Sequence, residues 1–421
     1  MRVLRRLHVL DRVAAALLAA GLACVATGLL PGGAASGAMS RIAPLLAFLG
    51  TVIVLAELTS RAEVFDVVAA RIAWAGRGSR PLLFLLCVAF ASVTTISLNL
   101  DTTAVLLTPV MLALASRVGI AAVPLAMTTV WLANTASLLL PVSNLTNLLA
   151  ADRVALSPLG LAGRMWAPQL AAVAVTTACL WLFFWRPVSR TAGDGRDLES
   201  GGPGAVRVEP AQRPPREGRY ALPEVHRPAD RVLFRACALA CGGFLLAILV
   251  ADVPLWIASA TAAAVAVTAF ALRERRALRW SLVPWRLLVM VPGMFLVVET
   301  VTAHGLHDLL AAAVGDDGGV LGRFRAAAVG AGLSNVLNNL PVYLAGEGAV
   351  PVGNHDQLLA LLIGTNAGPV ITPWASLATL LWYERCLAHG VRVPLARLIG
   401  TGAVLALTAV TASVAALSLT G

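Results

Sequence analysis

The sequence contains no lysine and few charged or aromatic residues. Only 13% of its 421 residues are charged and 6% are aromatic, whereas 58% are hydrophobic and the mean hydropathy is +0.82. Soluble domains carry about 25% charged residues, so this composition excludes an ordinary soluble protein. The net charge is +10 and all 32 basic residues are arginine. Many of these arginines flank apolar runs, which argues against nucleic acid as a partner.

The chain also lacks motifs for ATP hydrolysis and for nucleophilic catalysis. It has no Walker motif and no G-x-S-x-G elbow, so we expect no enzyme of those classes and no cofactor. The six cysteines form no CxxC pair. We interpret them as small packing residues, although Cys237 and Cys241, four residues apart, would also suit a soft metalloid. No metal site is predicted.

Long apolar runs predict an all-α polytopic membrane protein. A helix of roughly 20 apolar residues is long enough to cross a bilayer. The candidate spans lie near 12–30, 41–58, 81–96, 122–140, 166–185, 232–250, 254–271, 287–303, 356–383 and 398–418. Two further apolar pieces, near 97–116 and 326–346, carry polar residues in the middle. We expect these two pieces to be irregular.

The distribution of arginine predicts the orientation in the membrane. Basic residues gather at the N-terminus and in the loop 272–286, whereas the loop 31–40 has no charge. Because basic flanks mark the cytoplasmic side, we expect a cytoplasmic N-terminus in the inner or plasma membrane and an exterior loop 31–40. The first apolar run is interpreted as a retained helix, since no convincing cleavage site for a signal peptide precedes the next span.

Composition divides the chain into three parts. Residues 187–230 are rich in proline, glycine and charge, which is typical of a flexible linker. We expect this linker to be cytoplasmic. Residues 1–186 and 231–421 then form two membrane domains of similar size.

The two membrane domains contain a weak internal repeat. Residues 54–73 align with residues 296–315, which pairs Glu57 with Glu299. In the first half a polar hairpin, "SLNLDTTAVLLTP", and a broken apolar segment, "WLANTASLLLPVSNLTNLLA", follow. In the second half the same order is given by "LSNVLNNLPVYLA" and "LLIGTNAGPVITPWASLATLLW". Four features therefore recur in the same order: a helix with a glutamate, an amphipathic piece, a polar hairpin and a broken helix. This recurrence favours a true repeat.

The broken segments have a physical meaning in a membrane. An unpaired backbone amide in lipid costs several kcal/mol, so a break survives only against protein or a water-filled cavity. Secondary transporters bind substrate and coupling ions between such half-helices. Alternatively, the asparagine and threonine side chains near the breaks hold helices together by hydrogen bonds.

These motifs resemble the arsenite/antimonite permease family (ArsB type) of the ion transporter superfamily. That superfamily also includes NhaD-type sodium/proton antiporters, citrate transporters and divalent anion/sodium symporters. The resemblance implies two inverted repeats, each with a re-entrant hairpin and a discontinuous helix, that move substrate by alternating access. It also implies export of arsenite or antimonite, driven by the proton gradient alone or with an ATPase subunit as partner. Members of these families often form homodimers.

The resemblance assigns polar residues from all four motifs to the substrate and ion site. They are Asn99, Asp101, Thr102 and Thr103 on the first hairpin, Ser143, Asn144, Thr146 and Asn147 at the first break, Asn335, Asn338 and Asn339 on the second hairpin, and Thr365, Asn366, Ala367 and Gly368 at the second break.

Asp101 is the main candidate for ion coupling. An ionisable residue at membrane depth is a functional hypothesis by default, and this carboxylate could carry a proton or coordinate sodium. The alternative is a helix cap at the hairpin turn. No arginine lies in the four motifs to bind a dianion. A small inorganic oxyacid that is largely uncharged, such as arsenous acid, therefore fits better than a dicarboxylate.

Other assignments remain open at this point. Glu57 and Glu299 are either solvated helix ends or part of a proton relay. A sodium-coupled carboxylate or sulfate transporter, or a sodium/proton antiporter, would use the same fold. A non-transporting membrane scaffold is the third hypothesis, and it predicts no effect on replacing Asn144 or Asn366.

Overall fold

The computed structural model describes residues 9–186, 219–224, 227–250 and 253–420. This part of the chain is helical, and its one element of β structure is an isolated bridge between Ser79 and Arg219. Within it, seven helices are long and apolar enough to cross a membrane by length and composition. The predicted all-α polytopic fold is confirmed. Most of the predicted linker 187–230 lies outside the described residues.

The helices of the first half follow the predicted order of apolar segments. Their bounds are α1 (Val9–Ala26), α2 (Gly32–Arg61), α3 (Val64–Ala75), α4 (Arg80–Ser97), α5 (Leu100–Thr102), α6 (Thr108–Val118), α7 (Ala122–Thr135), α8 (Leu145–Arg153) and α9 (Pro158–Leu180). A π-helical turn, η2 (Thr103–Leu107), joins α5 to α6, and a second one, η4 (Trp181–Trp185), extends α9. A short 3-10 turn, η3 (Pro141–Ser143), lies between α7 and α8.

The second half starts with one additional helix. Its helices are α10 (Arg231–Val250), α11 (Leu255–Arg273), α12 (Trp285–Val301), α13 (His307–Val314), α14 (Val320–Leu337), α15 (Asn339–Glu347), α16 (His355–Ala367), α17 (Leu377–Ala388) and α18 (Leu395–Thr420). Short turns η5 (Arg275–Ala277) and η6 (Trp280–Leu282) precede α12, and a π-helical turn η7 (Thr302–Leu306) follows it.

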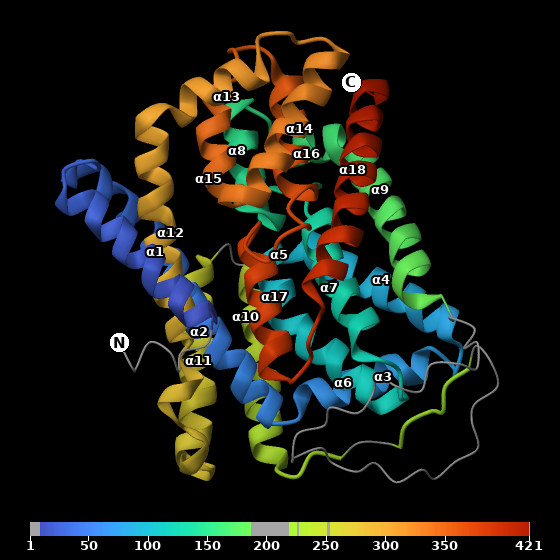
Figure 1. Ribbon diagram of the computed structural model, residues 1–421. Coiled ribbons are helices and arrows are strands. Elements are labelled where there is room, and N and C mark those ends of the chain that lie inside the picture. The colour runs from blue at the N-terminus through green and yellow to red at the C-terminus, as the bar shows by residue number, and fades with distance from the viewer. Residues whose placement is uncertain (1–8, 187–218, 225–226, 251–252, 421) are drawn as a thin grey trace.

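The same order of elements occurs in both halves. A long helix and a short helix (α2 and α3, or α12 and α13) precede a hairpin (α4–α6, or α14 and α15). A broken helix (α7 and α8, or α16 and α17) and a final long helix (α9, or α18) follow. Figure 1 places α3 at the lower end of the molecule and α13 at the upper end. This placement is what an inverted pair of repeats would produce, and the inverted relation itself stays a prediction.

One boundary differs from the sequence expectation. The predicted loop 31–40 is mostly helical, because α2 starts at Gly32 directly after Pro31. Its alanines, glycines and serines carry no charge, and they extend the apolar helix instead of interrupting it. The apolar run 356–383 consists of two helices, α16 and α17, separated by an irregular segment, as its broken motif predicted.

Close contacts between helices hold the two halves together. In one group, α1 packs along α12 and α2 packs along α11. Gly293 on α12 allows the first contact, because a Cβ atom there would lie 2.4 Å from the backbone nitrogen of Leu18. In the other group, α9 of the first half packs on α18 of the second half, and α14 packs on α16 within the second half. Small residues at such crossings are the usual way in which membrane helices approach each other.

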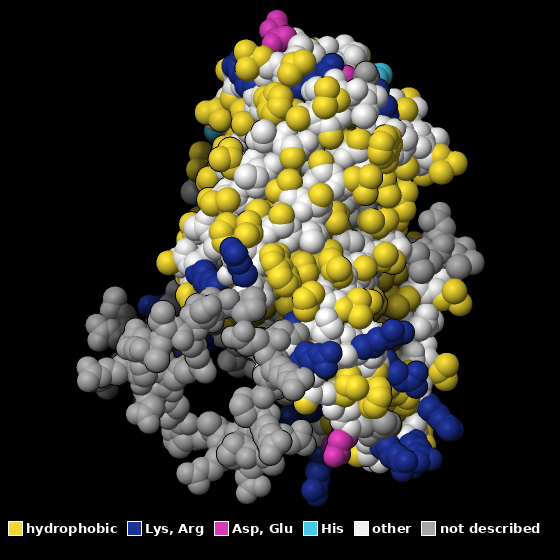
Figure 2. Space-filling model, turned by 90° about the vertical axis from the view of Figure 1, so that its right-hand side faces the viewer, with side chains coloured by type: hydrophobic (Ala, Val, Ile, Leu, Met, Phe, Trp, Pro, Cys, Tyr) yellow, Lys and Arg dark blue, Asp and Glu magenta, His cyan; other side chains and the backbone are white. Residues whose placement is uncertain are grey.

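The surface separates apolar and basic side chains. Figure 2 shows hydrophobic side chains over the middle of one face and basic side chains gathered toward its lower end. Several large apolar residues are strongly exposed, among them Leu239 at 76% and Leu407 at 71%. Exposed apolar surface on this scale is expected for a protein that contacts lipid.

Candidate functional site

The starts of four helical segments meet at one small cavity in the middle of the protein. The cavity has a volume of about 50 Å³ and is lined by residues from α5, α8, α15 and α17, with α2 and α12 completing the wall. From the four predicted motifs, it is lined by Asp101 on the first hairpin, Asn144 at the first break, and Asn338 and Asn339 on the second hairpin. The fold thus brings together residues that are more than 230 positions apart in the sequence.

Each of the four helix starts is capped by a polar side chain. The caps, with the backbone N–H group that each accepts, are Asn99 with Thr102 (2.6 Å), Asn144 with Thr146 (3.2 Å), Asn338 with Leu340 (3.4 Å) and Ser376 with Thr379 (3.0 Å). Asparagine and serine are favoured here because their side-chain oxygen pairs with an N–H group that has no partner within the helix. The break motifs therefore carry asparagine partly to start a helix inside the protein.

The backbone is irregular at both hairpins beside the cavity. Asn338, at the tip of the second hairpin, has a φ of +103°, a backbone angle that residues other than glycine rarely adopt. In the first hairpin, the π-helical turn η2 directly follows the segment that contains Asp101. Both kinds of irregularity are frequent at functional sites.

Asp101 and Asn144 present unpaired polar atoms at the cavity. The Oδ1 atom of Asp101 and the Nδ2 atom of Asn144 are buried and have no hydrogen-bond partner. Buried polar atoms are nearly always paired in native proteins, which makes these two atoms candidates for binding a ligand. The alternative role of Asp101 as the cap of its helix does not fit, because Asn99 occupies the cap position and Asp101 lies in the first turn.

The helix starts also determine the electrostatics of the cavity. The N-terminus of a helix carries a partial charge of about +0.5, and the segments beginning with α5, α8, α15 and α17 direct theirs toward this point. Together they offset the negative charge of one carboxylate in an otherwise apolar setting. They also favour oxygen atoms of a ligand as hydrogen-bond acceptors.

A buried network connects the two broken helices. The Oγ1 atom of Thr146 donates to Oδ1 of Asn366 at 2.7 Å, and Nδ2 of Asn366 donates to Oδ1 of Asn147 at 2.7 Å. All three side chains are fully buried. These predicted site residues are engaged with one another and do not line the cavity.

Other predicted residues hold the irregular backbone at the two breaks. At the first break, Nδ2 of Asn147 donates to the carbonyl oxygens of Ser137 (2.7 Å) and Leu140 (2.9 Å), and the hydroxyl of Ser143 donates to both as well. At the second break, Asn335 donates to the carbonyl of Gly368 and accepts from the N–H of Ile371. These bonds replace those that a continuous helix would make.

The remaining predicted residues have local roles. Thr103 donates to the carbonyl of Asn99 at 2.8 Å, and Thr365 donates to the carbonyl of Leu362 at 3.1 Å. The hydroxyl oxygen of Thr102 is buried without a partner. At Gly368 a Cβ atom would lie 2.4 Å from the side chain of Ala331, so this position is a close crossing of α14 and α16.

Sequence reasoning missed a set of buried polar residues behind the first break. Gln169 on α9 accepts from the N–H of Leu138 at 2.8 Å, and Asn134 donates to the hydroxyl of Thr379 at 3.2 Å. Both Gln169 and Asn134 are buried. A polar residue inside an otherwise apolar run was the available signal. Gln169 directly follows Pro168 and Asn134 lies at the start of the first broken segment, but neither belongs to the polar clusters at the hairpins and breaks.

The two aligned glutamates are paired with arginines. Glu57 lies 3.4 Å from both Arg61 and Arg385, and Glu299 lies 3.1 Å from Arg41. Both glutamate side chains are about a third exposed, at 29% and 32%. This geometry is compatible with solvated helix ends, and a relay role stays a hypothesis.

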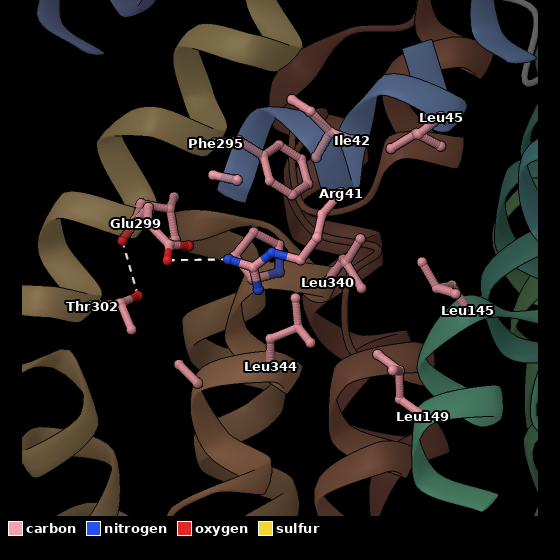
Figure 3. Close-up of a pocket in the computed structure, with 14 residues that line it drawn as sticks. Arg41, Ile42, Leu45, Leu145, Leu149, Phe295, Glu299, Thr302, Leu340 and Leu344 are labelled. Atoms are coloured by element: carbon pink, nitrogen blue, oxygen red, sulfur yellow. Dashed lines mark hydrogen bonds and ion pairs between the residues drawn. The ribbon is translucent and has the colours of Figure 1, made fainter. Parts of the chain in front are cut away.

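The Glu299–Arg41 pair stands beside a larger pocket that adjoins the cavity. This pocket has a volume of about 330 Å³ and lies between α2, α8, α12 and α15. Figure 3 shows Arg41 reaching toward Glu299 at one side, while the other labelled side chains are mostly apolar. No sequence motif predicted that an arginine would come this close to the site.

The described residues contain no group of histidine, cysteine, aspartate and glutamate that could hold a metal ion. Cys241 lies 3.3 Å from the hydroxyl of Thr59, and Cys237 lies 3.9 Å from the carbonyl of Leu58. These contacts fit the interpretation of both cysteines as packing residues between α10 and α2.

A cavity formed by broken helices, with unpaired polar atoms and an adjoining pocket, defines a polytopic membrane transport protein. Residues 3–379 match the citrate transporter family, and the chain belongs to that family. It is a transporter and not an enzyme. The family resemblance seen in the motifs is confirmed.

The chain is also similar to named proteins over most of its length. The arsenical pump membrane protein of Yersinia enterocolitica is 29% identical over 392 residues, which covers 87% of this chain and 84% of that protein. The arsenical pump membrane protein of Escherichia coli strain K12 is 27% identical over 395 residues, with the same coverage. The crystal structure of the Alcanivorax borkumensis YdaH transporter is 15% identical and covers 91% of this chain and 86% of that one, with a TM-score of 0.43.

Proposed function

We propose that this chain exports arsenite or antimonite in exchange for protons, by alternating access. The observation that supports this most is the pair of unpaired atoms at the cavity, Oδ1 of Asp101 and Nδ2 of Asn144. Relatives over most of the chain's length are named arsenical pump membrane proteins. A small oxyacid with hydroxyl groups suits both features.

The two unpaired atoms are complementary to a hydroxyl group. A hydroxyl of arsenous acid can donate to the carboxylate oxygen of Asp101 and accept from the amide of Asn144. A protonated Asp101 is a weaker acceptor, because one of its oxygens then carries the proton. Proton and substrate therefore compete for the same carboxyl group, and this competition couples their movements in opposite directions.

The orientation follows from the basic side chains. The arginine-rich loop that contains η5 and η6 lies at the lower end of Figure 1, at which α2 also ends. By the positive-inside rule this end is cytoplasmic. The pocket beside Arg41 lies nearer the start of α2 and therefore toward the outside. In this arrangement the substrate would leave the cell through that pocket.

A coupled carboxylate transporter is the second candidate. The name of the family favours it, and the four helix starts would attract a carboxylate. The small cavity and the negative charge of Asp101 argue against a tricarboxylate in the described conformation. Sodium dependence of transport would favour this candidate.

The test is uptake into everted membrane vesicles from an arsenite-sensitive host. Wild type is compared with Asp101→Asn, which keeps the size of the side chain and removes its titratable proton. The matched control is Asp66→Asn, which removes a carboxylate that pairs with Arg117 at 2.7 Å and is absent from the cavity lining. Immunoblotting of the vesicles confirms equal amounts of protein.

We expect arsenite uptake driven by an imposed proton gradient in wild type and Asp66→Asn, and at least a tenfold loss in Asp101→Asn. Uptake that persists in Asp101→Asn would remove Asp101 from the coupling mechanism. No arsenite uptake by wild type would refute the proposed function, and the same vesicles would then be assayed with citrate in the presence and absence of sodium.

A further inference from the structure

The central cavity and the pocket beside Arg41 share four apolar wall residues. Leu45, Leu145, Phe295 and Leu340 line both spaces, and we call them the apolar collar. On one side of the collar lie the unpaired polar atoms of the cavity. On the other side the pocket reaches the surface at its ion pair, whose two side chains are 57% and 32% exposed.

The collar is formed by two different groups of helices. Leu145 directly follows Asn144, the cap of α8, and Leu340 lies two residues after Asn338, the cap of α15. Leu45 and Phe295 come from the long helices α2 and α12. Figure 3 shows all four side chains around the pocket. The path from the cavity to the surface thus runs between the site helices and the α2–α12 pair.

An apolar constriction discriminates by charge. An ion that passes it loses hydration without gaining a polar partner, whereas an uncharged solute loses far less. The collar itself contains no charged or polar side chain. The ion pair beyond it has no net charge, because Glu299 neutralises Arg41, so it does not help an anion to enter.

We propose that the apolar collar makes this transporter selective for small uncharged hydroxylated solutes and excludes their anions. The inference deepens the proposed function, on which its choice of substrate rests. It assigns specificity to Leu45, Leu145, Phe295 and Leu340, which do not bind the substrate by hydrogen bonds.

Thiol labelling tests the collar without any need for transport. Asn144→Cys places a reporter thiol at the cavity, and the unmodified chain gives the background from its own cysteines. Methyl methanethiosulfonate is the uncharged probe, and 2-sulfonatoethyl methanethiosulfonate is the anionic probe. We expect the reporter to react at least tenfold more slowly with the anionic probe, after correction for the rates of both probes with a free thiol.

Two leucines of α15 provide a matched pair of second substitutions. Leu340→Ser makes the collar polar and should raise the rate of the anionic probe at least tenfold. Leu344 lies one turn further along α15 and lines only the wider pocket. Leu344→Ser should therefore leave the rate of the anionic probe unchanged. Asp101→Cys serves as a second reporter if Asn144→Cys does not accumulate in the membrane.

Three results would overturn the proposal. They are equal corrected rates for the two probes, equal effects of Leu340→Ser and Leu344→Ser, or no reaction of either reporter with either probe. Failure of the proposed function would give a different result. Arsenite uptake would be absent, while the reporter thiol would still react faster with the uncharged probe than with the anionic probe.

Discussion

Replacing Asn366 by leucine should separate the two broken helices. Leucine has the same branched shape, although it is larger, and it removes both hydrogen bonds of the Asn366 side chain, which accepts from Thr146 and donates to Asn147 at 2.7 Å each. The hydroxyl of Thr146 and the Oδ1 atom of Asn147 then remain buried without a partner. Since both residues are fully buried, water cannot replace the lost partner without a change in structure.

The size of the effect can be bracketed in two ways. An unpaired buried polar group costs about 1–3 kcal/mol, which gives about 2–6 kcal/mol for two groups. Hydrogen bonds between membrane helices average about 0.6 kcal/mol with a maximum of about 1.7, which gives about 1–3 kcal/mol. We expect a loss of about 2–3 kcal/mol, where the two ranges overlap.

The assay is reversible unfolding of the purified protein in mixed micelles with increasing SDS. Thr365→Val is the matched control on the same helix. Its hydroxyl bonds only to the carbonyl of Leu362 in the preceding turn, so its loss should cost less than about 1 kcal/mol. Arsenite uptake is measured in parallel, because the scaffold hypothesis expects no functional effect of Asn366→Leu.

A double-mutant cycle makes the reasoning refutable. Combining Asn366→Leu with Asn147→Leu removes both partners of one bond, so the two losses should not add. Equal losses for Asn366→Leu and Thr365→Val, or full additivity in the cycle, would refute the role of Asn366 as a bridge between the breaks.

Further predictions concern other parts of the fold. Gly364→Val should destabilise the protein by about 1–3 kcal/mol or more, because a Cβ atom there would lie 2.1 Å from the carbonyl oxygen of Ala327; a melting temperature equal to that of wild type in detergent would contradict this close crossing. Tyr220→Phe removes the hydroxyl that donates to the carbonyl of Ala73 and should cost about 0.5–1.5 kcal/mol; the same SDS titration measures it, and an unchanged midpoint would show that the bond contributes nothing. Glu299→Gln leaves the guanidinium that lies 3.1 Å away without its counter-charge, so sulfate loaded into the lumen of everted vesicles, which the pocket faces, should inhibit arsenite uptake at lower concentrations than in wild type; an unchanged inhibition constant would show that the ion pair has no influence on anions at the pocket.

The recurrence of motifs allowed much of the architecture to be predicted. The polar hairpins and broken segments lie where the sequence placed them, with breaks between α7 and α8 and between α16 and α17. These features are local, because prolines and glycines limit the helix where they stand. The prediction of a loop over 31–40 was wrong for an equally local reason. A run of small uncharged residues is compatible with both a loop and a helix.

The division of roles within the site could not be predicted in the same way. Asn144 and Asn366 stand in similar motifs, but one lines the cavity and the other bridges two breaks. Because Asn99 caps α5, Asp101 does not act as the helix cap. A side chain's partner depends on which segments face it, and residues such as Asn366 and Thr146 are 220 positions apart.

The sequence alone determined that this protein spans a membrane, that it has two halves with interrupted helices, and which polar residues interrupt them. Composition and local backbone preference are sufficient for these conclusions. Only the tertiary structure decided that four helix starts meet at one cavity, that Asp101 and Asn144 each keep an unpaired buried atom there, and that four apolar side chains line both the cavity and the Arg41 pocket. These properties depend on the packing of helices from both halves, and neither half contains that information by itself.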